Sequence, residues 1–354
     1  MNRDRSVTAR ELEASGLSYI ETVEPGITRT RRGRGFSFQS ANGTLIRDPE
    51  ERERLLAIAV PPSYEHVVYC LDPDGHLQAT GVDSKGNTQY FYHPEYEKLR
   101  DRKKFSRLSK FGEALPAFRR KVTRRLKNSD SEKEKVLCAI MRILDGTGMR
   151  IGSNSATHNN KTFGLTTLHK KHVSVDEDDI RFAYKGKGGG KITCELQDPL
   201  VSDLLNTCLH HSGSRLFEYE NDEGQTQQIY SGDVNLFIQQ HMGESFSAKD
   251  FRTWRFSCLF LEELTKRSEQ EAVTLKEVLE MLSESTCNTP AILKSSYVHP
   301  GLLRACKEGS KGYRRKPQKP LPGLRKAENY LLRYLGSRHA RRALRSEEIQ
   351  KAAE

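Results

Sequence analysis

The segment from Asn288 to Pro300, NTPAILKSSYVHP, carries signals for both the start and the end of a helix. Thr289 supplies a hydroxyl of the kind that caps helix N-termini, and Pro290 has the fixed φ suited to the first helical position. The pair therefore predicts a helix that begins here and continues over residues 291–298. His299 precedes Pro300, and a residue before proline disfavours helical geometry, so the helix should end there.

Tyr297 lies near the end of this predicted helix, which would hold its hydroxyl at a defined place. A phenol has a pKa of about 10 and is a poor nucleophile unless cations surround its target. The chain carries candidate cations in order: Arg150 in GMRIG, Lys187 in YKGKGG and Arg252 in KDFRTW. These residue types are suited to an attack by tyrosine on an anionic group.

These motifs, followed by KSSYVHP around Tyr297, resemble those of the type IB DNA topoisomerases of poxviruses and bacteria, and the resemblance covers nearly the whole chain. It implies an enzyme, an isomerase, that relaxes supercoiled duplex DNA by cutting one strand, forming a 3′-phosphotyrosyl intermediate, letting the helix swivel and resealing the strand. It also implies that no ATP, metal or other cofactor is required. The sequence has no P-loop pattern.

A phosphodiester under attack gains charge on its non-bridging oxygens, and planar guanidinium groups match that charge. Arg150 and Arg252 therefore suit the role of phosphate clamps. The leaving 5′ oxygen needs a proton, which an ammonium on a mobile, glycine-flanked hairpin can deliver, so Lys187 suits a general acid. Taken alone, each residue would more often be ordinary surface charge. The interpretation depends on their joint occurrence.

Position 288 departs from the family pattern. Most members carry a histidine nine residues before the tyrosine, and this chain has Asn288. An asparagine amide can donate a hydrogen bond to a phosphate oxygen, but it carries no charge. We expect Asn288 to act as a neutral donor in a catalytic set with Tyr297, Arg150, Lys187 and Arg252.

The resemblance also implies DNA contacts outside the catalytic set. Gln89, Tyr90 and Tyr92, in QYFY, would face DNA from the N-terminal domain, because glutamine can pair with adenine in the major groove and tyrosine hydroxyls can reach bases or phosphates. Ordinary strand alternation, with Phe91 on the opposite, buried face, explains the same pattern, and both can hold. Lys249, in KDFRTW, is carried over as a further DNA contact.

The resemblance and the apolar pattern together predict an α+β fold of the tyrosine recombinase and topoisomerase IB type. Residues 1–100 should form a small β-rich DNA-binding domain, in which turns such as Asn42-Gly43 separate short strands. Residues 101–306 should form a mainly α-helical catalytic domain with a β hairpin. Residues 307–354 should form a basic C-terminal tail, either with affinity for the DNA backbone or as a solvated linker with a docking helix.

Within the catalytic domain, four strands are expected at residues 164–168, 172–175, 180–184 and 192–196. The acidic run 176–179 would cap a turn between two of them. A two-metal site is the alternative for this run, and it would need further carboxylates from other elements.

The 354 residues include 58 Lys+Arg against 47 Asp+Glu, and the pI of about 9.2 predicts attraction to nucleic acid. Seven scattered cysteines argue for a reducing compartment and against a disulfide framework or zinc site. No apolar run approaches the roughly 18 residues of a membrane span, and the N-terminus does not resemble a secretory signal. We expect a cytoplasmic, nucleoid-associated protein that clamps duplex DNA as a monomer and makes no membrane contact.

Two alternatives remain at this point. A tyrosine recombinase uses much the same residues, but it usually has His-x-x-Arg where this chain has Lys249 to Arg252, and its N-terminal domain is helical where this one has strand patterns. The other alternative is an architectural DNA-binding protein that has lost its activity, for which Asn288 is the only support. Relaxation of a supercoiled plasmid without a cofactor would distinguish the three.

Overall fold

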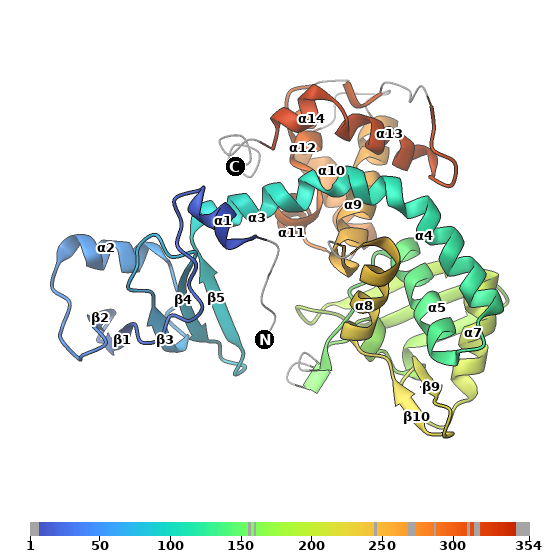
Figure 1. The fold of residues 1–354 in the computed structure, drawn as a ribbon, viewed down its shortest axis with the longest axis horizontal. Helices are drawn as coiled ribbons and strands as arrows, with labels where there is room; N and C mark the ends of the chain where they lie inside the picture. The colour runs from blue at the N-terminus through green and yellow to red at the C-terminus, as the bar shows by residue number, and fades with distance from the viewer. Residues whose placement is uncertain are drawn as a thin grey trace. The chain divides into compact units, whose positions relative to one another are not determined.

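The computed structural model describes residues 7–154, 157–158, 161–243, 246–267, 274–286, 288–309, 312–314 and 319–344. The chain divides into two compact units, Met1–Lys103 and Lys104–Glu354 (Figure 1). The first unit is built on a β sheet and the second is mainly helical. The α+β fold class predicted from the sequence is confirmed.

The N-terminal unit is organised around a five-stranded antiparallel sheet with the strand order β2-β1-β3-β4-β5. Its elements are α1 (Ala9–Glu13), β1 (Ile27–Arg32), β2 (Gly35–Gln39), α2 (Pro49–Ala57), β3 (Glu65–Tyr69), β4 (Leu77–Val82), β5 (Thr88–Tyr92) and α3 (Pro94–Ser106), which contains the boundary between the units. Leu55 of α2 packs with Ile27, Phe38 and Tyr69 of the sheet in one buried cluster. This cluster gives the sheet one apolar face.

The basic run 28–35 forms most of the β1–β2 hairpin. Arg29 has a structural role, because its guanidinium donates to the carbonyls of Val60, at 2.8 Å, and Tyr64, at 3.2 Å. The other arginines of the run are exposed: Arg31, Arg32 and Arg34.

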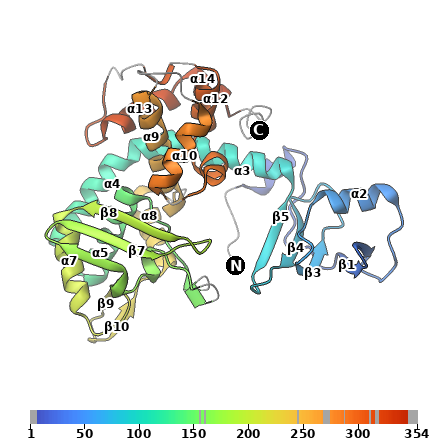
Figure 2. The same cartoon turned by 180° about the vertical axis from the view of Figure 1, so that it is seen from behind.

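The helices of the second unit are α4 (Leu108–Asn128), α5 (Glu132–Thr147), α7 (Pro199–His210), α8 (Ser231–Met242), α9 (Ala248–Arg267), α10 (Leu275–Thr286), α11 (Pro290–Ile292), α12 (Pro300–Lys307), α13 (Lys326–Leu335) and α14 (Arg338–Arg342). Its strands are β6 (Val173–Asp176), β7 (Asp179–Lys185), β8 (Lys191–Gln197), β9 (Glu218–Glu220) and β10 (Thr226–Gln228). They pair as a three-stranded sheet, β6-β7-β8, and a two-stranded sheet, β10-β9 (Figure 2).

The three-stranded sheet has one buried face. Along β7, Ile180, Phe182 and Tyr184 are buried and the residues between them are exposed. Helices α5 and α7 pack against this sheet, and the turn between β7 and β8 projects beyond them (Figure 2). The strands predicted at 172–175, 180–184 and 192–196 are confirmed. The one predicted at 164–168 is wrong, because a short 3-10 turn, η1 (Leu165–Thr167), occupies that place.

The core of the second unit centres on α5 and α9. All residues from Val136 to Leu144 in α5 are buried except Arg142. Trp254 of α9 is also buried, and it lies so close to α4 that a Cβ atom on Gly112 would come within 2.3 Å of its ring. The glycine in α4 therefore permits α9 to pack closely against it.

The C-terminal helices belong to the same core. Leu331, Tyr334 and Leu335 of α13 are buried in it, and α13 contacts both α4 and α9. In the predicted tail, α13 is thus packed against the core, whereas most of residues 319–326 are exposed and residues 345–354 lie outside the described residues. The division into a DNA-binding domain, a catalytic domain and a tail stays a prediction.

In the described part of the chain, no helix has both the length and the apolar character needed to cross a membrane. No group of three or more His, Cys, Asp or Glu side chains there could hold a metal ion. The acidic run 176–179 forms the turn between β6 and β7, as predicted. Cys287 lies outside the described residues, and the six described cysteines do not pair as disulfides.

Candidate active site

Tyr297 lies at the end of a short helix that changes form along its length. Thr289 caps α11 through its hydroxyl, as predicted. The chain then continues as a π-helical turn, η3 (Leu293–Tyr297), in which the N–H of Val298 donates to the carbonyl of Leu293 at 2.9 Å. The predicted helix is thus present, with a wider final turn. Single π turns are rare and often occur at functional sites.

Ser257, a buried residue of α9, fixes the backbone on both sides of Val298. Its hydroxyl donates to the carbonyl of Tyr297 and accepts from the N–H of His299, both at 3.1 Å. His299 in turn caps α12, because its Nδ1 accepts the N–H of Gly301 at 3.0 Å. Burial lowers the pKa of His299 to about 3, so this cap stays neutral at ordinary pH.

Arg252 contacts the tyrosine directly. Its Nε donates to Oη of Tyr297 at 3.0 Å, and the guanidinium carbon lies 4.6 Å from the centre of the ring. One terminal nitrogen donates to Oδ1 of Asn288 at 3.1 Å and the other donates to the carbonyl of Gly148. Arg252 is only 5% exposed. Burial lowers the pKa of Arg252, but an arginine in a protein keeps its charge.

Arg150 reaches the same place from the loop after α5. That helix ends at Gly148, whose φ of +69° lies in the left-handed region that glycine adopts without strain. A terminal nitrogen of Arg150 donates to Oδ1 of Asn288 at 3.0 Å. The loop packs on Gly164, where a Cβ atom would lie 2.6 Å from the carbonyl oxygen of Arg150. The N–H of Leu165 donates to the carbonyl of Arg150 at 2.9 Å, which holds the loop against the turn that follows Gly164.

Asn288 is 4% exposed and joins the two arginines. Its Oδ1 accepts from both guanidiniums, while its Nδ2 donates to the carbonyl of Thr286 at 2.8 Å. If the amide were rotated by 180°, its NH₂ group would face the N–H donors of the two guanidiniums, and no hydrogen bond could form. In this structure Asn288 therefore holds Arg150 and Arg252 side by side, which differs from the expected role as a donor to phosphate.

Lys187 occupies the exposed turn between β7 and β8. Gly188 and Gly189 in this turn have φ of +91° and +87°, which only glycine adopts easily. The turn is closed by a hydrogen bond of 2.9 Å from the N–H of Gly186 to the carbonyl of Gly190. In the described structure the Lys187 ammonium donates no hydrogen bond. The charge of Lys187 nevertheless lowers the pKa of Tyr297.

Opposing effects act on the pKa of Tyr297. Burial raises it, whereas the charges of Arg252 and Arg150, the hydrogen bond from Arg252 and the charge of Lys187 lower it, and the net pKa lies below the ordinary value. The structure thus brings Tyr297, Arg252, Arg150 and Asn288 into one hydrogen-bonded cluster, with Lys187 near enough to influence it.

The profile of the family described as "Eukaryotic DNA topoisomerase I, catalytic core" matches residues 93–293, more than half of the chain. The chain belongs to the type IB DNA topoisomerase family. A second profile, "Bacterial DNA topoisomerase IB, N-terminal domain", matches residues 35–83 of this topoisomerase. The resemblance based on four short motifs is therefore confirmed at the level of the family.

Two viral relatives show how far the similarity extends. DNA topoisomerase 1B of Acanthamoeba polyphaga mimivirus is 28% identical over 295 residues, which cover 80% of this topoisomerase and 88% of the relative. DNA topoisomerase 1B of Vaccinia virus (strain Copenhagen) is 24% identical over 243 residues, which cover 64% and 72% of the two chains. The similarity thus includes most of both relatives.

Lys249 lies in the first turn of α9 and is exposed. The next residue, Asp250, is buried, accepts the N–H of Ser247 at 2.9 Å and forms an ion pair with Arg107 at 2.8 Å. These contacts fix the start of α9 and direct Lys249 to the surface. Its contact with DNA stays a prediction.

In the N-terminal unit, Tyr90 is 52% exposed and Tyr92 is half-buried, and their rings stack with centroids 6.5 Å apart. Phe91 faces the opposite, apolar side of β5, as expected. Gln89 alternates with Tyr90 along the strand, so it shares the face of Phe91, and its amide donates to Asp83 at 2.9 Å. The structure thus places Tyr90 and Tyr92 together on one face of β5 and Gln89 on the other face.

Three further residues contact the catalytic cluster, and none of them was predicted from the sequence. Phe256 packs edge-on against Tyr297, with ring centroids 5.1 Å apart, and Ser257 and Gly148 provide the hydrogen bonds described above. Phe256 follows Arg252 by one helical turn, so helix periodicity could have placed it on the same face. No pattern in the sequence indicates the carbonyl of Gly148.

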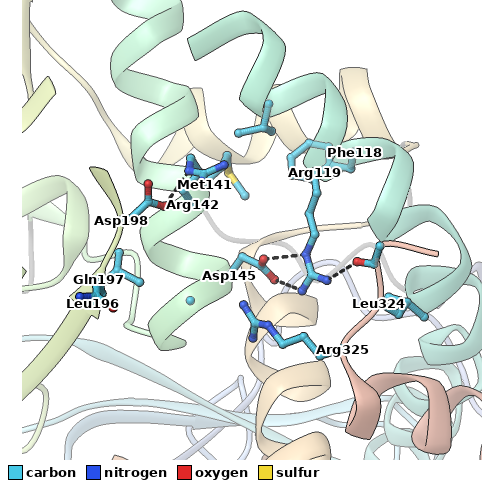
Figure 3. Close-up of a pocket in the computed structure, with 13 residues that line it drawn as sticks. Phe118, Arg119, Met141, Arg142, Asp145, Leu196, Gln197, Asp198, Leu324 and Arg325 are labelled. Atoms are coloured by element: carbon cyan, nitrogen blue, oxygen red, sulfur yellow. Dashed lines mark hydrogen bonds and ion pairs between the residues drawn. The ribbon is translucent and has the colours of Figure 1, made fainter. Parts of the chain in front are cut away.

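A cavity of about 530 Å³ lies apart from this cluster, among α4, α5, β8 and the segment before α13 (Figure 3). Ion pairs line it, Arg119 with Asp145 at 2.8 Å and Arg142 with Asp198 at 2.7 Å. None of the five predicted catalytic residues belongs to its lining in the described structure. The cavity therefore does not mark the active site.

Replacing Asn288 with aspartate tests its contact with the arginines. A carboxylate there should bind Arg150 and Arg252 more strongly and place a negative charge near Tyr297, which raises the pKa of the phenol. We expect single-turnover DNA cleavage at neutral pH to be about 10- to 100-fold slower and the pH–rate profile to move to higher pH. Asn288→His, which restores the residue typical of the family, should retain activity. Cleavage by the Asp variant at the wild-type rate and pH would exclude this role.

Proposed function

We propose that this type IB topoisomerase relaxes supercoiled duplex DNA by transient cleavage of one strand, with Tyr297 as the nucleophile. The observation that carries the proposal is the 3.0 Å hydrogen bond from Arg252 to Oη of Tyr297, within a set of cations that includes Arg150 and Lys187. Positive charge beside a phenol favours its ionised form, and it also provides a binding place for phosphate.

In the cleavage step, Tyr297 loses its phenolic proton to water and Oη attacks the scissile phosphorus. A bond forms between Oη and phosphorus, and the bond between phosphorus and the 5′ oxygen breaks. Lys187 gives a proton to the departing oxygen, which leaves a 3′-phosphotyrosyl bond on the enzyme and a 5′-hydroxyl on the DNA. Religation reverses the step, because the hydroxyl displaces Tyr297 and its proton returns to Lys187.

Arg150 and Arg252 would bind the non-bridging oxygens of the phosphate. Both donate to one oxygen of Asn288, at 3.0 and 3.1 Å, so the two guanidiniums are already adjacent before DNA binds. Donors that are held in place beforehand need little rearrangement as charge develops in the transition state, and such preorganisation is usually the largest contribution to catalysis.

The partner is duplex DNA, in keeping with the formal net charge of +11. We propose that Gln89, Tyr90, Tyr92 and Lys249 contact it and that the enzyme acts as a monomeric clamp in the cytoplasm, on the nucleoid. One phosphodiester is exchanged for another at little net cost, so the strain of supercoiling can drive the reaction. The proposal therefore includes neither ATP nor a metal.

Plasmid relaxation tests this function. Purified protein in excess chelator, without ATP, should convert a supercoiled plasmid to relaxed topoisomers, and binding should weaken as salt rises because DNA binding displaces counterions. An architectural DNA-binding protein would retard the plasmid without changing its linking number, and a recombinase would join specific sites. An absolute requirement for Mg²⁺ or ATP would contradict the proposed mechanism.

A further inference from the structure

We propose that helix α13 braces the active site: Glu328 and Tyr334 are positioning residues that hold the elements bearing Arg150, Arg252 and Tyr297 in register. The inference rests on the proposed function. Neither residue contacts Tyr297 or the two arginines in the described structure. Glu328 acts through a buried contact with α9, which carries Arg252, and Tyr334 acts through the start of α12, which follows the Tyr297 segment.

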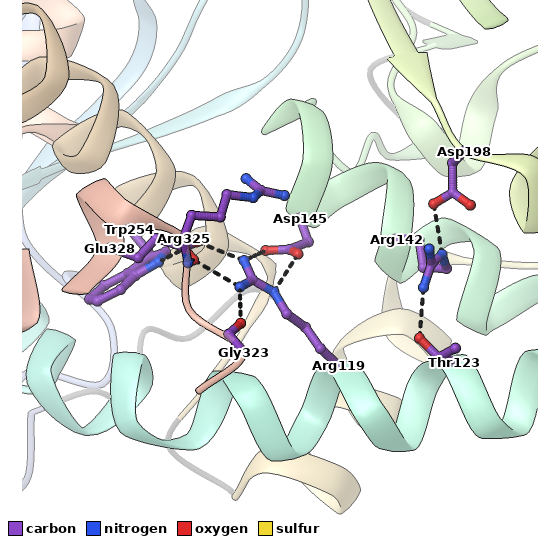
Figure 4. A network of polar contacts seen from close by, with 9 residues as sticks. All are labelled: Arg119, Thr123, Arg142, Asp145, Asp198, Trp254, Gly323, Arg325 and Glu328. Carbon is purple, nitrogen blue, oxygen red and sulfur yellow. Dashed lines mark hydrogen bonds and ion pairs between the residues drawn. The ribbon is translucent and has the colours of Figure 1, made fainter. Parts of the chain in front are cut away.

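Glu328 makes the first of these connections (Figure 4). Glu328 is 3% exposed, and its carboxylate accepts Nε1–H of Trp254 at 3.2 Å. Trp254 follows Arg252 by two residues on α9, and its ring is packed against α4. The same carboxylate accepts the N–H of Arg325 at 2.7 Å, which caps the start of α13. Glu328 thus ties α13 directly to the helix of Arg252.

Arg119 of α4 carries the connection to the loop of Arg150. Two of its bonds reach Glu328, at 2.6 and 2.8 Å, two reach Asp145, at 2.8 and 2.9 Å, and one reaches the carbonyl of Gly323 at 3.0 Å. All the N–H donors of a guanidinium are then used. Asp145 is in the last turn of α5, immediately before the loop that holds Arg150. Figure 4 shows Arg119 between the two carboxylates.

Tyr334 makes the third connection. Its hydroxyl is buried and donates to the carbonyl of Gly301 at 2.7 Å. Gly301 lies in the first turn of α12, directly after the Tyr297 segment, and a Cβ atom there would be 3.1 Å from the Tyr334 hydroxyl. Bonds from α13 thus reach α9 and the start of α12 directly, and they reach the end of α5 through Arg119.

A buried ionic network is weak support for stability, because removing charges from water costs about as much as their attraction returns. It does define geometry, since a guanidinium shared by two carboxylates accepts only a narrow range of positions. A misplacement of about 1 Å in catalytic groups can slow a reaction about 100-fold. Loss of the bonds from α13 should shift α9 and the end of α5, and with them the guanidiniums of Arg252 and Arg150.

Glu328→Gln is the main test. We expect single-turnover cleavage at saturating protein to be about 10- to 100-fold slower, at a temperature where circular dichroism shows the variant fully folded. The pH–rate profile should also move to higher pH, because displaced arginines lower the pKa of Tyr297 less. Loss of stability alone would lower Tm without moving this profile. The wild-type rate in the same assay tests the proposed function separately.

Asn329→Ala is the matched control. Asn329 is the next residue of α13 and is also buried, but among the described residues its side chain bonds only to backbone groups of Leu321, Leu324 and Arg325. This variant should lower Tm and retain the wild-type cleavage rate. If Glu328→Gln does not fold, Tyr334→Phe, which removes one hydrogen bond and keeps the buried ring, decides the question. Wild-type rates in the folded variants, or slowing no greater than in Asn329→Ala, would overturn the proposal.

Discussion

Replacing Tyr297 with phenylalanine is expected to abolish plasmid relaxation and DNA cleavage while DNA affinity changes by no more than a few-fold. Phenylalanine keeps the ring that packs against Phe256 and Arg252, but it lacks the attacking oxygen. The cleavage rate should fall by about 10⁴-fold or more, as in other enzymes that lose a nucleophile. Relaxation assays, detection of the covalent adduct on denaturing gels and a DNA-binding titration measure the three quantities.

Tyr230→Phe provides the control for this substitution. Tyr230 is half exposed and lies directly before α8, so its hydroxyl should not affect the reaction. The control should relax DNA at the wild-type rate. Substantial turnover by Tyr297→Phe under the same conditions would show that another group attacks the DNA.

Replacing Lys187 with alanine should slow cleavage of ordinary DNA by about 10²- to 10⁴-fold, because the 5′ oxygen would have to leave without a proton. A substrate with sulfur at that bridging position has a leaving group that needs no proton, so the variant should cleave it at nearly the wild-type rate. Lys187 also lowers the pKa of Tyr297. A small remaining deficit should therefore shrink as the pH rises. Single-turnover cleavage of both substrates measures these effects.

Lys191→Ala is the control that distinguishes proton donation by Lys187 from a general effect of positive charge on the hairpin. Lys191 is exposed at the start of β8, just beyond the same turn. Its substitution should leave cleavage of both substrates close to wild type. If sulfur fails to rescue Lys187→Ala, Lys187 contributes charge and not a proton.

Much of the catalytic cluster could be predicted from the sequence because the motifs are local. Thr289 and Pro290 define where the nucleophile's helix begins, and the glycines around Lys187 define a turn between two strands. Strand alternation in β7 and the continuous apolar run of α5 likewise follow from short-range patterns. These features depend on neighbours in the sequence, so the chain alone reveals them.

The features that could not be predicted depend on contacts between distant segments. The sequence shows Asn288 but not which of its amide atoms faces Arg150 and Arg252. It shows a basic C-terminal segment but not that Glu328 is buried against Arg119. It shows Gly164 but not its close approach to the Arg150 loop, where a Cβ atom would lie 2.6 Å from the carbonyl oxygen of Arg150.

The identity of the residue joined to DNA tests the central claim most directly. A cleaved complex can be trapped by denaturation, digested with trypsin and nuclease, and analysed by mass spectrometry and by the chemistry of the new DNA ends. We predict one DNA-linked peptide, residues 295–304 with the sequence SSYVHPGLLR, modified at Tyr297 through a 3′-phosphate, and a 5′-hydroxyl on the other side of the cut. Attachment at any other residue, or to a 5′-phosphate, would contradict the mechanism.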